Sequence, residues 1–403
     1  MKVESSEFIR EALATYTRIN VEALEWMIAR PSARQPFLDL KLNSITLQNY
    51  RDADGLRSPA YVYGWIQGRG LEALVSHGIW LQSRNRDLSE RLLARAELLY
   101  AALAALVDRD GGAYFLYDRD MRPAWADAQG ALHPQNLRTG YRGPADAFVA
   151  KGLIAAARHF DPDRLGDWLV FLADIVASVE EGRFIIAEKQ AFDASAIASQ
   201  ATNYSPYMLM LSAADLLNRL GLGDAARFGE RFIAHALGNH LDAATNLLRD
   251  EVSGDFCNPG HAVEFAGFAL AYCRATGLEA PLPALLDLVE GCAKSGFHGP
   301  GLAIGVSVAT GQLESPYFPW WALPETIRAA AHAYALSGEA RFLHIWREAH
   351  DRFFTRYWRG SPPIAIQNRD INGPVDVAPA TPDLDPLYHT GLSLLGAMEA
   401  VEG

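Results

Sequence analysis

The sequence has few cysteines and no long apolar run without charges. The cysteines are three in number, Cys257, Cys273 and Cys292. An odd number without metal-ligand spacing fits neither a disulfide framework nor a structural zinc site. The stretch from Met1 to Phe8 carries acids where a secretion signal needs an apolar segment, and no segment could span a bilayer. We therefore expect reduced, packed cysteines in a cytoplasmic protein without a membrane partner.

The common cofactor fingerprints are missing as well. No G-x-x-x-x-G-K-[ST], H-E-x-x-H or C-x-x-C pattern occurs. The pairs of glycines at Gly68-Arg-Gly70 and Gly111-Gly112 are too short to form phosphate loops. The sequence thus predicts chemistry that uses neither a cofactor nor a metal.

Positive charge is scarce relative to negative charge. The formal net charge is −12 and the pI is near 5.4, which argues against nucleic acid and anionic membranes as partners. A neutral or weakly charged small molecule is a better partner for such a chain. Half of the 403 residues are hydrophobic, enough for a large core. We expect a monomer or a homodimer.

Apolar residues recur mostly with the spacing of α-helices, and few stretches alternate as strands do. Paired helices of this kind can close into an (α/α)6 barrel, in which inner helices surround an axis and their loops form one concave face. An open helical solenoid is the alternative. About twelve helices are predicted, at residues 7–30, 58–81, 87–107, 143–160, 164–181, 203–219, 222–240, 259–276, 281–296, 320–336, 339–357 and 384–400.

Some connections between these helices are too long and too aromatic for plain linkers. The segments Asp108 to Arg142 and Phe297 to Phe318 are examples, and loops of this length are usually functional. Asp110 to Asp120 has the glycine turn and aromatic alternation of a short β-hairpin, and Phe354 to Asp376 is a second hairpin candidate. No linker divides the chain, so we expect an all-α barrel with small hairpins in its loops and one catalytic domain over residues 1–403.

A histidine and a glutamate stand three residues apart at the start of one predicted helix. In Asn258-Pro-Gly-His-Ala-Val-Glu264, proline and glycine suit the entry into the helix, and His261 and Glu264 share one helical face. A polar pair at a helix mouth can be an ordinary solvated pair. It can also be part of a site.

Two further segments join aromatic side chains to polar ones near helix starts. This mixture suits a sugar, because flat rings stack on pyranoses while amides, guanidinium groups and carboxylates bind hydroxyls. Ordinary packing of the aromatic residues is the alternative. An arginine in an apolar, glycine-rich run must be paired or must face a cavity. The candidate binding residues are Tyr63, Trp65, Gln67 and Arg69 in the first segment and Trp320, Trp321 and Glu325 in the second.

His261 and His389 are the candidates for an acid and a base. An imidazole titrates near neutral pH, so two facing imidazoles could remove a proton from one carbon and return it elsewhere. His133 and His298 lie on predicted loops and could border a site. The remaining histidines are expected on the surface or in the core: His77, His159, His235, His240, His332, His344 and His350.

Taken in chain order, these segments resemble the N-acylglucosamine 2-epimerase family, which includes cellobiose 2-epimerases and mannose isomerases. Trp65-Ile-Gln-Gly-Arg69 resembles the family's W-x-Q-x-R, and Asp118-Arg-Asp-Met-Arg-Pro123 resembles its D-R-D-G-x-P hairpin. Asn258 to Glu264 resembles P-G-H-x-x-E, Trp320-Trp-Ala-Leu-Pro-Glu325 resembles W-W-x-x-x-E, and Tyr388-His389 stands where the family keeps its last histidine. The resemblance covers most of the chain and implies an (α/α)6 barrel.

The resemblance also implies the roles of three residues. His261 and His389 would be the acid/base pair, and Arg69 would stabilise the negative oxygen of an enediolate. Return of the proton to the same carbon is epimerisation, and delivery to the neighbouring carbon is aldose–ketose isomerisation. The predicted activity is therefore cofactor-independent proton transfer at C2 of a sugar.

One helix departs from the family pattern. Where members commonly carry N-P-h-M-H-x-x-E-A, this chain has Ser205-Pro-Tyr-Met-Leu-Met-Leu-Ser-Ala213, so Leu209 and Ser212 replace a histidine and a glutamate. The loss of two hydrogen-bonding groups changes which sugar hydroxyls can be accepted.

Two other functions fit the same scaffold. One is a glycoside hydrolase or lyase, because such barrels can host a catalytic carboxylate pair. The other is a carbohydrate-binding relative without catalysis. The carboxylates available for hydrolysis are Glu264, Glu325, Asp118 and Asp193.

Overall fold

The computed structural model describes residues 2–136, 140–378 and 380–402. Contacts between residues divide the chain into two compact units, each assembled from separate stretches of sequence. The first unit comprises Met1–Trp26, Thr202–Pro379 and His389–Gly403, and the second comprises Met27–Ala201 and Ala380–Tyr388. The single catalytic domain over residues 1–403 stays a prediction.

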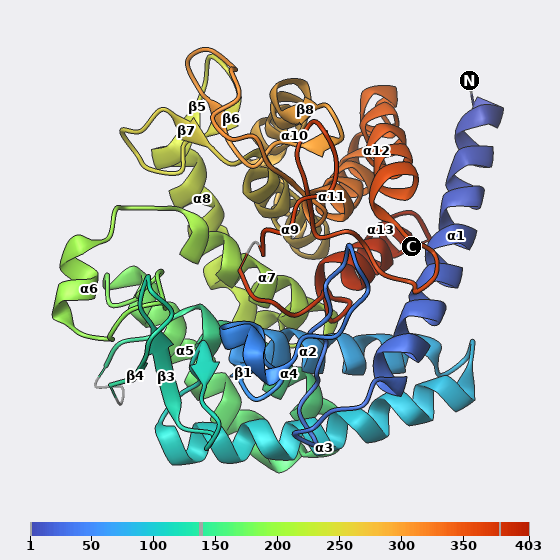
Figure 1. The fold of residues 1–403 in the computed structure, drawn as a ribbon. Coiled ribbons are helices and arrows are strands. Elements are labelled where there is room, and N and C mark those ends of the chain that lie inside the picture. Colours follow the sequence, from blue (N-terminus) through green and yellow to red (C-terminus); the bar gives the residue numbers. More distant parts are fainter. Residues whose placement is uncertain (1, 137–139, 379, 403) are drawn as a thin grey trace. The chain divides into compact units, whose positions relative to one another are not determined.

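In the first unit, central helices pack against one another in chain order, and each of the first three is covered by the helix that follows it (Figure 1). Most side chains of α9 and α11 are buried. Both helices carry small and apolar residues on all of their faces, as is typical of a helix in a core. α12 is amphipathic and buries one face. The central helices are α7 (Ser205–Arg219), α9 (Pro259–Thr276), α11 (Ala322–Ser337) and α13 (Ser393–Glu402); the covering helices are α8 (Phe228–His240), α10 (Leu282–Gly296) and α12 (Ala340–Arg352).

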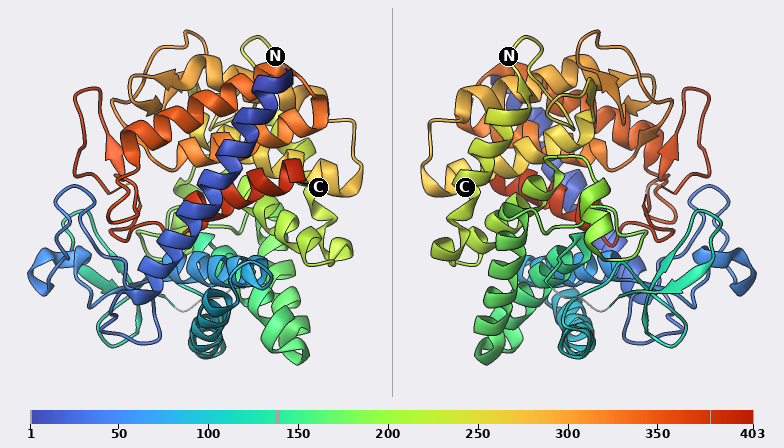
Figure 2. Two further views of the ribbon diagram at one scale, coloured as in Figure 1. Left: turned by 90° about the vertical axis from the view of Figure 1, so that its right-hand side faces the viewer. Right: turned by 90° about the vertical axis from the view of Figure 1, so that its left-hand side faces the viewer.

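The ends of the chain meet within the first unit. Figure 2 shows α1 (Lys2–Ala29) crossing α13 in its left-hand view. The Asn20 side chain donates to the Gly391 carbonyl at 3.1 Å, and Thr17 contacts the Met398 sulfur at 3.5 Å. Residues near the start of the chain therefore stabilise the helical turns that follow His389.

The second unit contains two helical hairpins and a short extra helix. The two inner helices cross with their backbones in contact, because a Cβ on Gly68 would lie 2.5 Å from the Phe148 carbonyl carbon and one on Gly152 would lie 2.7 Å from the Gly68 oxygen. Glycine is required at this crossing. The elements are α2 (Gly64–Leu81) with α3 (Arg86–Asp110), α4 (Pro144–Phe160) with α5 (Leu165–Glu180), and α6 (Ala194–Ser199).

The strands are short and belong to the loops, as predicted. Within the described residues, the second unit has one antiparallel sheet, and the first unit has four two-stranded pairs. In the second unit the order is β1 (Val62–Tyr63), β2 (Leu116–Tyr117), β3 (Pro123–Ala126) and β4 (Leu132–Pro134). In the first unit β5 (Leu241–Asp242) pairs with β6 (Leu247–Leu248), β7 (Phe256–Cys257) with β10 (Val306–Ser307), β8 (Phe297–His298) with β9 (Gly301–Leu302), and β11 (Phe318–Pro319) with β12 (Asn368–Arg369).

Several predicted boundaries need correction. The helix expected from residue 58 begins at Gly64, because Val62 and Tyr63 pair with β2. The helix expected from residue 222 begins at Phe228, after a 3-10 turn at Gly223–Ala226. The last helix begins with a π-helical turn at Tyr388–Leu392 instead of at residue 384.

The two predicted hairpins also differ from expectation. The turn of the first lies between Tyr117 and Pro123, so its second strand falls beyond Asp120. In the segment from Phe354 to Asp376, single antiparallel bridges join Trp358 to Ala365 and Arg369 to Pro374, while β12 pairs along its length with the distant β11. Pairing at that range has no signature in local sequence.

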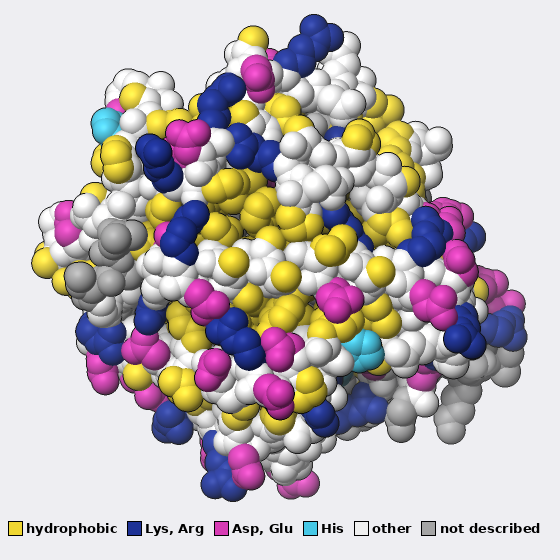
Figure 3. Space-filling view, turned by 90° about the horizontal axis from the view of Figure 1, so that it is seen from below, with side chains coloured by type: hydrophobic (Ala, Val, Ile, Leu, Met, Phe, Trp, Pro, Cys, Tyr) yellow, Lys and Arg dark blue, Asp and Glu magenta, His cyan; other side chains and the backbone are white. Residues whose placement is uncertain are grey.

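Among the described residues, none of the helices combines the length and apolarity that a membrane crossing requires. The face in Figure 3 carries basic and acidic side chains next to one another, around exposed hydrophobic groups. On that face the excess negative charge of the chain is thus dispersed among positive groups.

Candidate active site

A buried carboxylate orients one of the two candidate histidines. Glu325, in the first turn of α11, is fully buried and lies 2.9 Å from Nδ1 of His389. With Nδ1–H donating to that carboxylate, Nε2 of His389 is left to accept or deliver a proton. A hydrogen bond of this kind sets the tautomer and orientation of a catalytic imidazole.

A second residue on the same helix neutralises the carboxylate. Arg328, one turn after Glu325, forms a short ion pair with it and is itself 6 % exposed. Burial raises the pKa of Glu325, but the positive charge of Arg328 and the contact with His389 outweigh burial, so this pKa lies below its ordinary value. Glu325 is therefore an anion in the folded protein.

Trp321 brings the two histidines to one place in the first unit. Its indole stacks on the His261 imidazole with a centroid distance of 5.1 Å and lies 5.6 Å from that of His389. The indole can approach α9 because residue 260 is glycine, where a Cβ would lie 2.7 Å from the Trp321 ring. Trp320 meets His389 edge-on at 6.4 Å. Both imidazoles thus contact one aromatic ring.

The start of α9 positions His261. Asn258 caps the helix by accepting the His261 backbone N–H at 3.2 Å, and its side-chain amide lies 3.3 Å from His261 Nδ1. Asp250 accepts the Asn258 backbone N–H at 3.0 Å, and burial raises the pKa of Asp250 to about 6. The predicted turn into the helix is therefore a capped, hydrogen-bonded start.

Glu264 lies in the same group as Glu325 and His389. Each of the three offers a ligand atom, all three atoms lie within 4.8 Å of one another, and all three side chains are buried. Two carboxylates and an imidazole are a ligand set that a divalent cation could use. The guanidinium of Arg328 on Glu325 already supplies positive charge there and opposes a second cation.

The predicted arginine lies in the second unit, in an aromatic cage. The Arg69 guanidinium lies 4.0 Å from the ring centroid of Phe148 and 5.2 Å from those of Trp65 and Tyr388. Cation–π contacts of this kind stabilise a guanidinium in apolar surroundings. Lys151 lies beneath Tyr388 and donates to its hydroxyl at 2.6 Å.

The other predicted binding residues of the second unit make structural contacts. The Gln67 amide, 1 % exposed, bonds the backbone N–H and carbonyl of Leu38 at 2.8 and 2.9 Å. The Tyr63 hydroxyl donates to the Leu56 carbonyl at 3.0 Å. These contacts satisfy Gln67 and Tyr63 without a ligand.

Trp65 is half-buried between Phe115 and Phe148, at centroid distances of 5.1 and 5.4 Å. Its indole N–H donates to Glu188, which also accepts the Ala145 backbone N–H at 3.0 Å. The sequence analysis did not single out Glu188, because it lies in a loop far along the chain from Trp65.

The two substituted positions of α7 are buried in the first unit. Leu209 is 8 % exposed, and the Ser212 hydroxyl donates back to the Leu209 carbonyl at 2.6 Å. Ser212 therefore satisfies itself within its own helix. Where the family pattern has two polar groups, this chain therefore has a buried leucine and a serine that bonds within its own helix.

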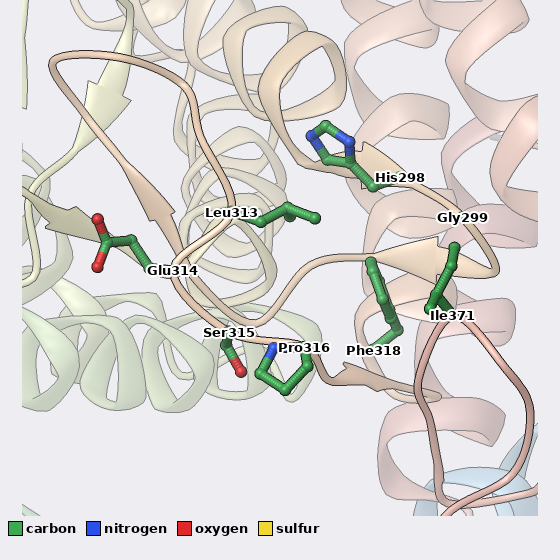
Figure 4. A pocket seen from close by; sticks show the side chains of 8 residues that line it. All are labelled: His298, Gly299, Leu313, Glu314, Ser315, Pro316, Phe318 and Ile371. Atoms are coloured by element: carbon green, nitrogen blue, oxygen red, sulfur yellow. The ribbon is translucent and has the colours of Figure 1, made fainter.

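A separate cavity of about 530 Å³ opens in the first unit, in the loops between α10 and β12 (Figure 4). None of the predicted catalytic residues lines it. His298, one of the two loop histidines, is in its wall, where its ring lies 3.0 Å from the Ser295 carbonyl. Phe318 and Ile371 both lie close to Gly299, the residue after His298. The other loop histidine, His133, pairs with Asp127 at 2.9 Å in the second unit.

The sequence analysis missed Arg328. Its signal was nevertheless present, because it stands in Glu325-Thr-Ile-Arg-Ala-Ala-Ala-His332, an arginine inside an apolar helix. The rule that selected Arg69, that such an arginine must be paired or must face a cavity, selects Arg328 equally well.

Comparison with known proteins gives a clear result at the level of the fold alone. No family model and no curated protein matches the sequence. Among solved structures, the chain is similar to a cellobiose 2-epimerase from Bacillus thermoamylovorans, with 18% identity, 100% of each chain covered and a TM-score of 0.73. It is also similar to a D-mannose isomerase, with 13% identity, 96% of this chain and 98% of that chain covered and a TM-score of 0.71.

A more distant likeness joins the chain to glycoside hydrolases. A family 76 mannosidase from Bacteroides thetaiotaomicron has 11% identity, with 96% of this chain and 98% of that chain covered and a TM-score of 0.57. Together these likenesses establish the fold, an all-α (α/α)6 barrel with small hairpins in its loops, as predicted. Cellobiose 2-epimerases and mannose isomerases are also the enzymes that the sequence motifs resemble. The likeness in fold therefore agrees with the likeness in motifs.

Proposed function

We propose that this protein is a sugar isomerase or epimerase that transfers a proton at C2 between His261 and His389. One observation carries the proposal: both imidazoles contact the Trp321 indole, and one of them is oriented by a buried carboxylate. An indole face suits the apolar face of a pyranose. An imidazole that a carboxylate holds at one ring nitrogen suits proton transfer through the other at neutral pH.

In this reaction one histidine acts as the base and removes the C2 proton beside the carbonyl of the open-chain sugar. The electron pair of the broken C–H bond forms the enediolate, whose negative oxygen needs a positive or hydrogen-bonding partner. The other histidine, in its protonated form, returns a proton to C2, or to C1 while the 2-hydroxyl proton passes to O1 and leaves the ketose carbonyl at C2. Arg69 as the partner of the enediolate oxygen stays a prediction from the sequence.

Hydrolysis by the same fold receives less support from the geometry. A glycosidase needs two carboxylates on either side of the bond that is cut, one of them free to protonate it. Glu325 is fully buried and engaged by Arg328 and His389, so it is suited to orient an imidazole and not to attack a sugar. A cytoplasmic location, a monomer or homodimer and a chemistry without cofactors stay predictions.

Exchange of the C2 proton with solvent tests the proposal directly. The protein would be incubated in D2O with a panel of aldoses and ketoses, and deuterium at C2 would be followed by NMR. We expect incorporation with at least one sugar and a loss of about 10²–10⁴-fold in His261→Asn and in His389→Asn. His344→Asn, at an exposed position of α12, is the matched control. No exchange with any sugar, or full activity in either variant, would refute it.

A further inference from the structure

Arg328 occupies a slot that the neighbouring helices leave open for it. Its guanidinium lies 3.7 Å from the ring centroid of Phe268 on α9. A Cβ on Gly267 of α9 would lie 3.2 Å from the Arg328 Nε, and one on Gly396 of α13 would lie 3.1 Å from its Cδ. Three helices of the first unit therefore shape the space around this side chain.

Charged side chains of α9 and α11 lie beside the pair formed by Glu325 and His389. The carboxylate of Glu264 on α9 lies within 4.8 Å of the contacting atoms of Glu325 and His389. Arg328 of α11 forms an ion pair with Glu325. His332, one turn further along α11, is buried, and burial lowers its pKa to about 4, so it is neutral near pH 7. Arg328 thus compensates Glu325 directly, beside a second buried carboxylate.

Loss of that compensation has a definite chemical result. Burial favours the protonated form of a carboxylic acid, and without a neighbouring cation Glu325 would take up a proton at neutral pH. A protonated Glu325 would donate to Nδ1 of His389 instead of accepting from it. The imidazole would then carry its hydrogen on Nε2, the atom that would exchange a proton with the substrate.

We propose that Arg328 is a positioning residue that keeps Glu325 ionised and thereby holds the neutral form of His389 with its hydrogen on Nδ1. Arg328 acts through Glu325. Its consequence for turnover rests on the proposed function, while its consequence for the His389 tautomer does not.

The tautomer can be measured without any substrate. Protein labelled with ¹⁵N-histidine would be examined by NMR above neutral pH, with the His389 resonances assigned by comparison with His389→Asn. We expect the Nδ1–H form in the wild type and a shift to the Nε2–H form in Arg328→Gln, which is neutral but still polar. Arg328→Lys keeps the charge and should restore the Nδ1–H form. Arg341→Gln, on the surface of α12, is the matched control and should leave it unchanged.

Turnover supplies the second readout. We expect kcat for C2 exchange to fall about 10- to 100-fold in Arg328→Gln, with KM little changed, and to recover largely in Arg328→Lys. An Nδ1–H tautomer and unchanged kcat in folded Arg328→Gln would overturn the inference. A tautomer change in a protein that exchanges no sugar would leave the inference standing and remove the proposed function.

Arg328→Gln could unfold, because it leaves Glu325 buried without its cation. In that case Gly396→Ala decides, since the added methyl group presses on the Arg328 side chain and keeps its charge. We expect a mixture of the two His389 tautomers and a reduced kcat in this variant. A wild-type tautomer and kcat would count against Arg328.

Discussion

At the scale of single residues, the site depends on side chains that the substrate never has to touch. Glu325 sets the hydrogen on His389, and Asn258 holds the first turn of α9 that carries His261. Asp250 in turn accepts the Asn258 N–H. Glu325 thus orients His389, and Asn258 positions His261.

The raised pKa of Asp250, about 6, predicts a measurable effect on stability. An acid whose pKa is higher in the folded protein binds more protons there than in the unfolded chain, so its contribution to stability falls as pH rises from about 4 to 6. Asp250→Asn keeps an oxygen for the Asn258 N–H and removes the titration. We expect the variant to gain about 1–3 kcal/mol over the wild type at pH 7.

Urea unfolding at several pH values measures this effect. The two proteins should have similar free energies of unfolding near pH 4, and the difference should open as pH rises. Parallel pH profiles for Asp250→Asn and the wild type would show that the carboxylate is not desolvated.

At the scale of the elements, glycines allow two helices to pack closely, and charged side chains are buried between the same helices. In the second unit, α2 and α4 touch at Gly68 and Gly152, and a fully buried ion pair joins the same two helices. The pair is Glu72 with Lys151, at 2.9 Å and with both side chains at most 2% exposed. Gly68 therefore serves the packing of α2 against α4.

This ion pair predicts a large and asymmetric effect on stability. Lys151→Met leaves the Glu72 carboxylate buried without its cation, and we expect a loss of about 3–5 kcal/mol in the free energy of unfolding. The double variant with Glu72→Gln removes both charges and should regain most of the loss. Urea titrations of the single and double variants measure both values.

An exposed ion pair provides the matched comparison. Arg86→Met breaks the pair with Glu90 on the surface of α3 and should change stability little, because water already solvates both groups. A Lys151→Met protein as stable as Arg86→Met would contradict the assignment of a buried, compensating charge.

At the scale of the whole molecule, one fold is shared by two chemistries. The chain is similar both to sugar epimerases and to glycoside hydrolases, so the fold does not choose between proton transfer and hydrolysis. Particular side chains support the choice proposed here, above all the engagement of Glu325 by Arg328 and His389.

Mass spectrometry of oligosaccharides separates the two reactions. Incubated with manno- and cello-oligosaccharides in D2O, the protein should leave the chain length unchanged, and deuterium should enter only the reducing-end sugar when that sugar is a substrate. Shorter products that disappear in Glu325→Gln would instead support a hydrolase.

Much of the helical framework could be read from local sequence. Apolar periodicity and end signals placed the helices that became α9 and α10 within one residue of their ends, because each helix carries its pattern in consecutive residues. The start of α2 was misplaced, since β1 depends on pairing with β2 more than fifty residues away.

The candidate site was predictable in part for the same reason. His261, Trp321, Glu325 and His389 belong to local motifs, and the first unit brings them together. Gln67 and Tyr63 belong to such a motif too, but their polar groups bond the backbone of Leu38 and Leu56 in the segment before it, which no motif specifies.

The sequence alone was sufficient to indicate most of the helices, their pairing and the residue types of the candidate site, because these follow from the order of neighbouring residues. Ionisation and orientation required the folded chain. The charge of Glu325 and the hydrogen on His389 depend on desolvation and on a guanidinium held among α9, α11 and α13. Those energies act through space, between residues that the sequence keeps far apart.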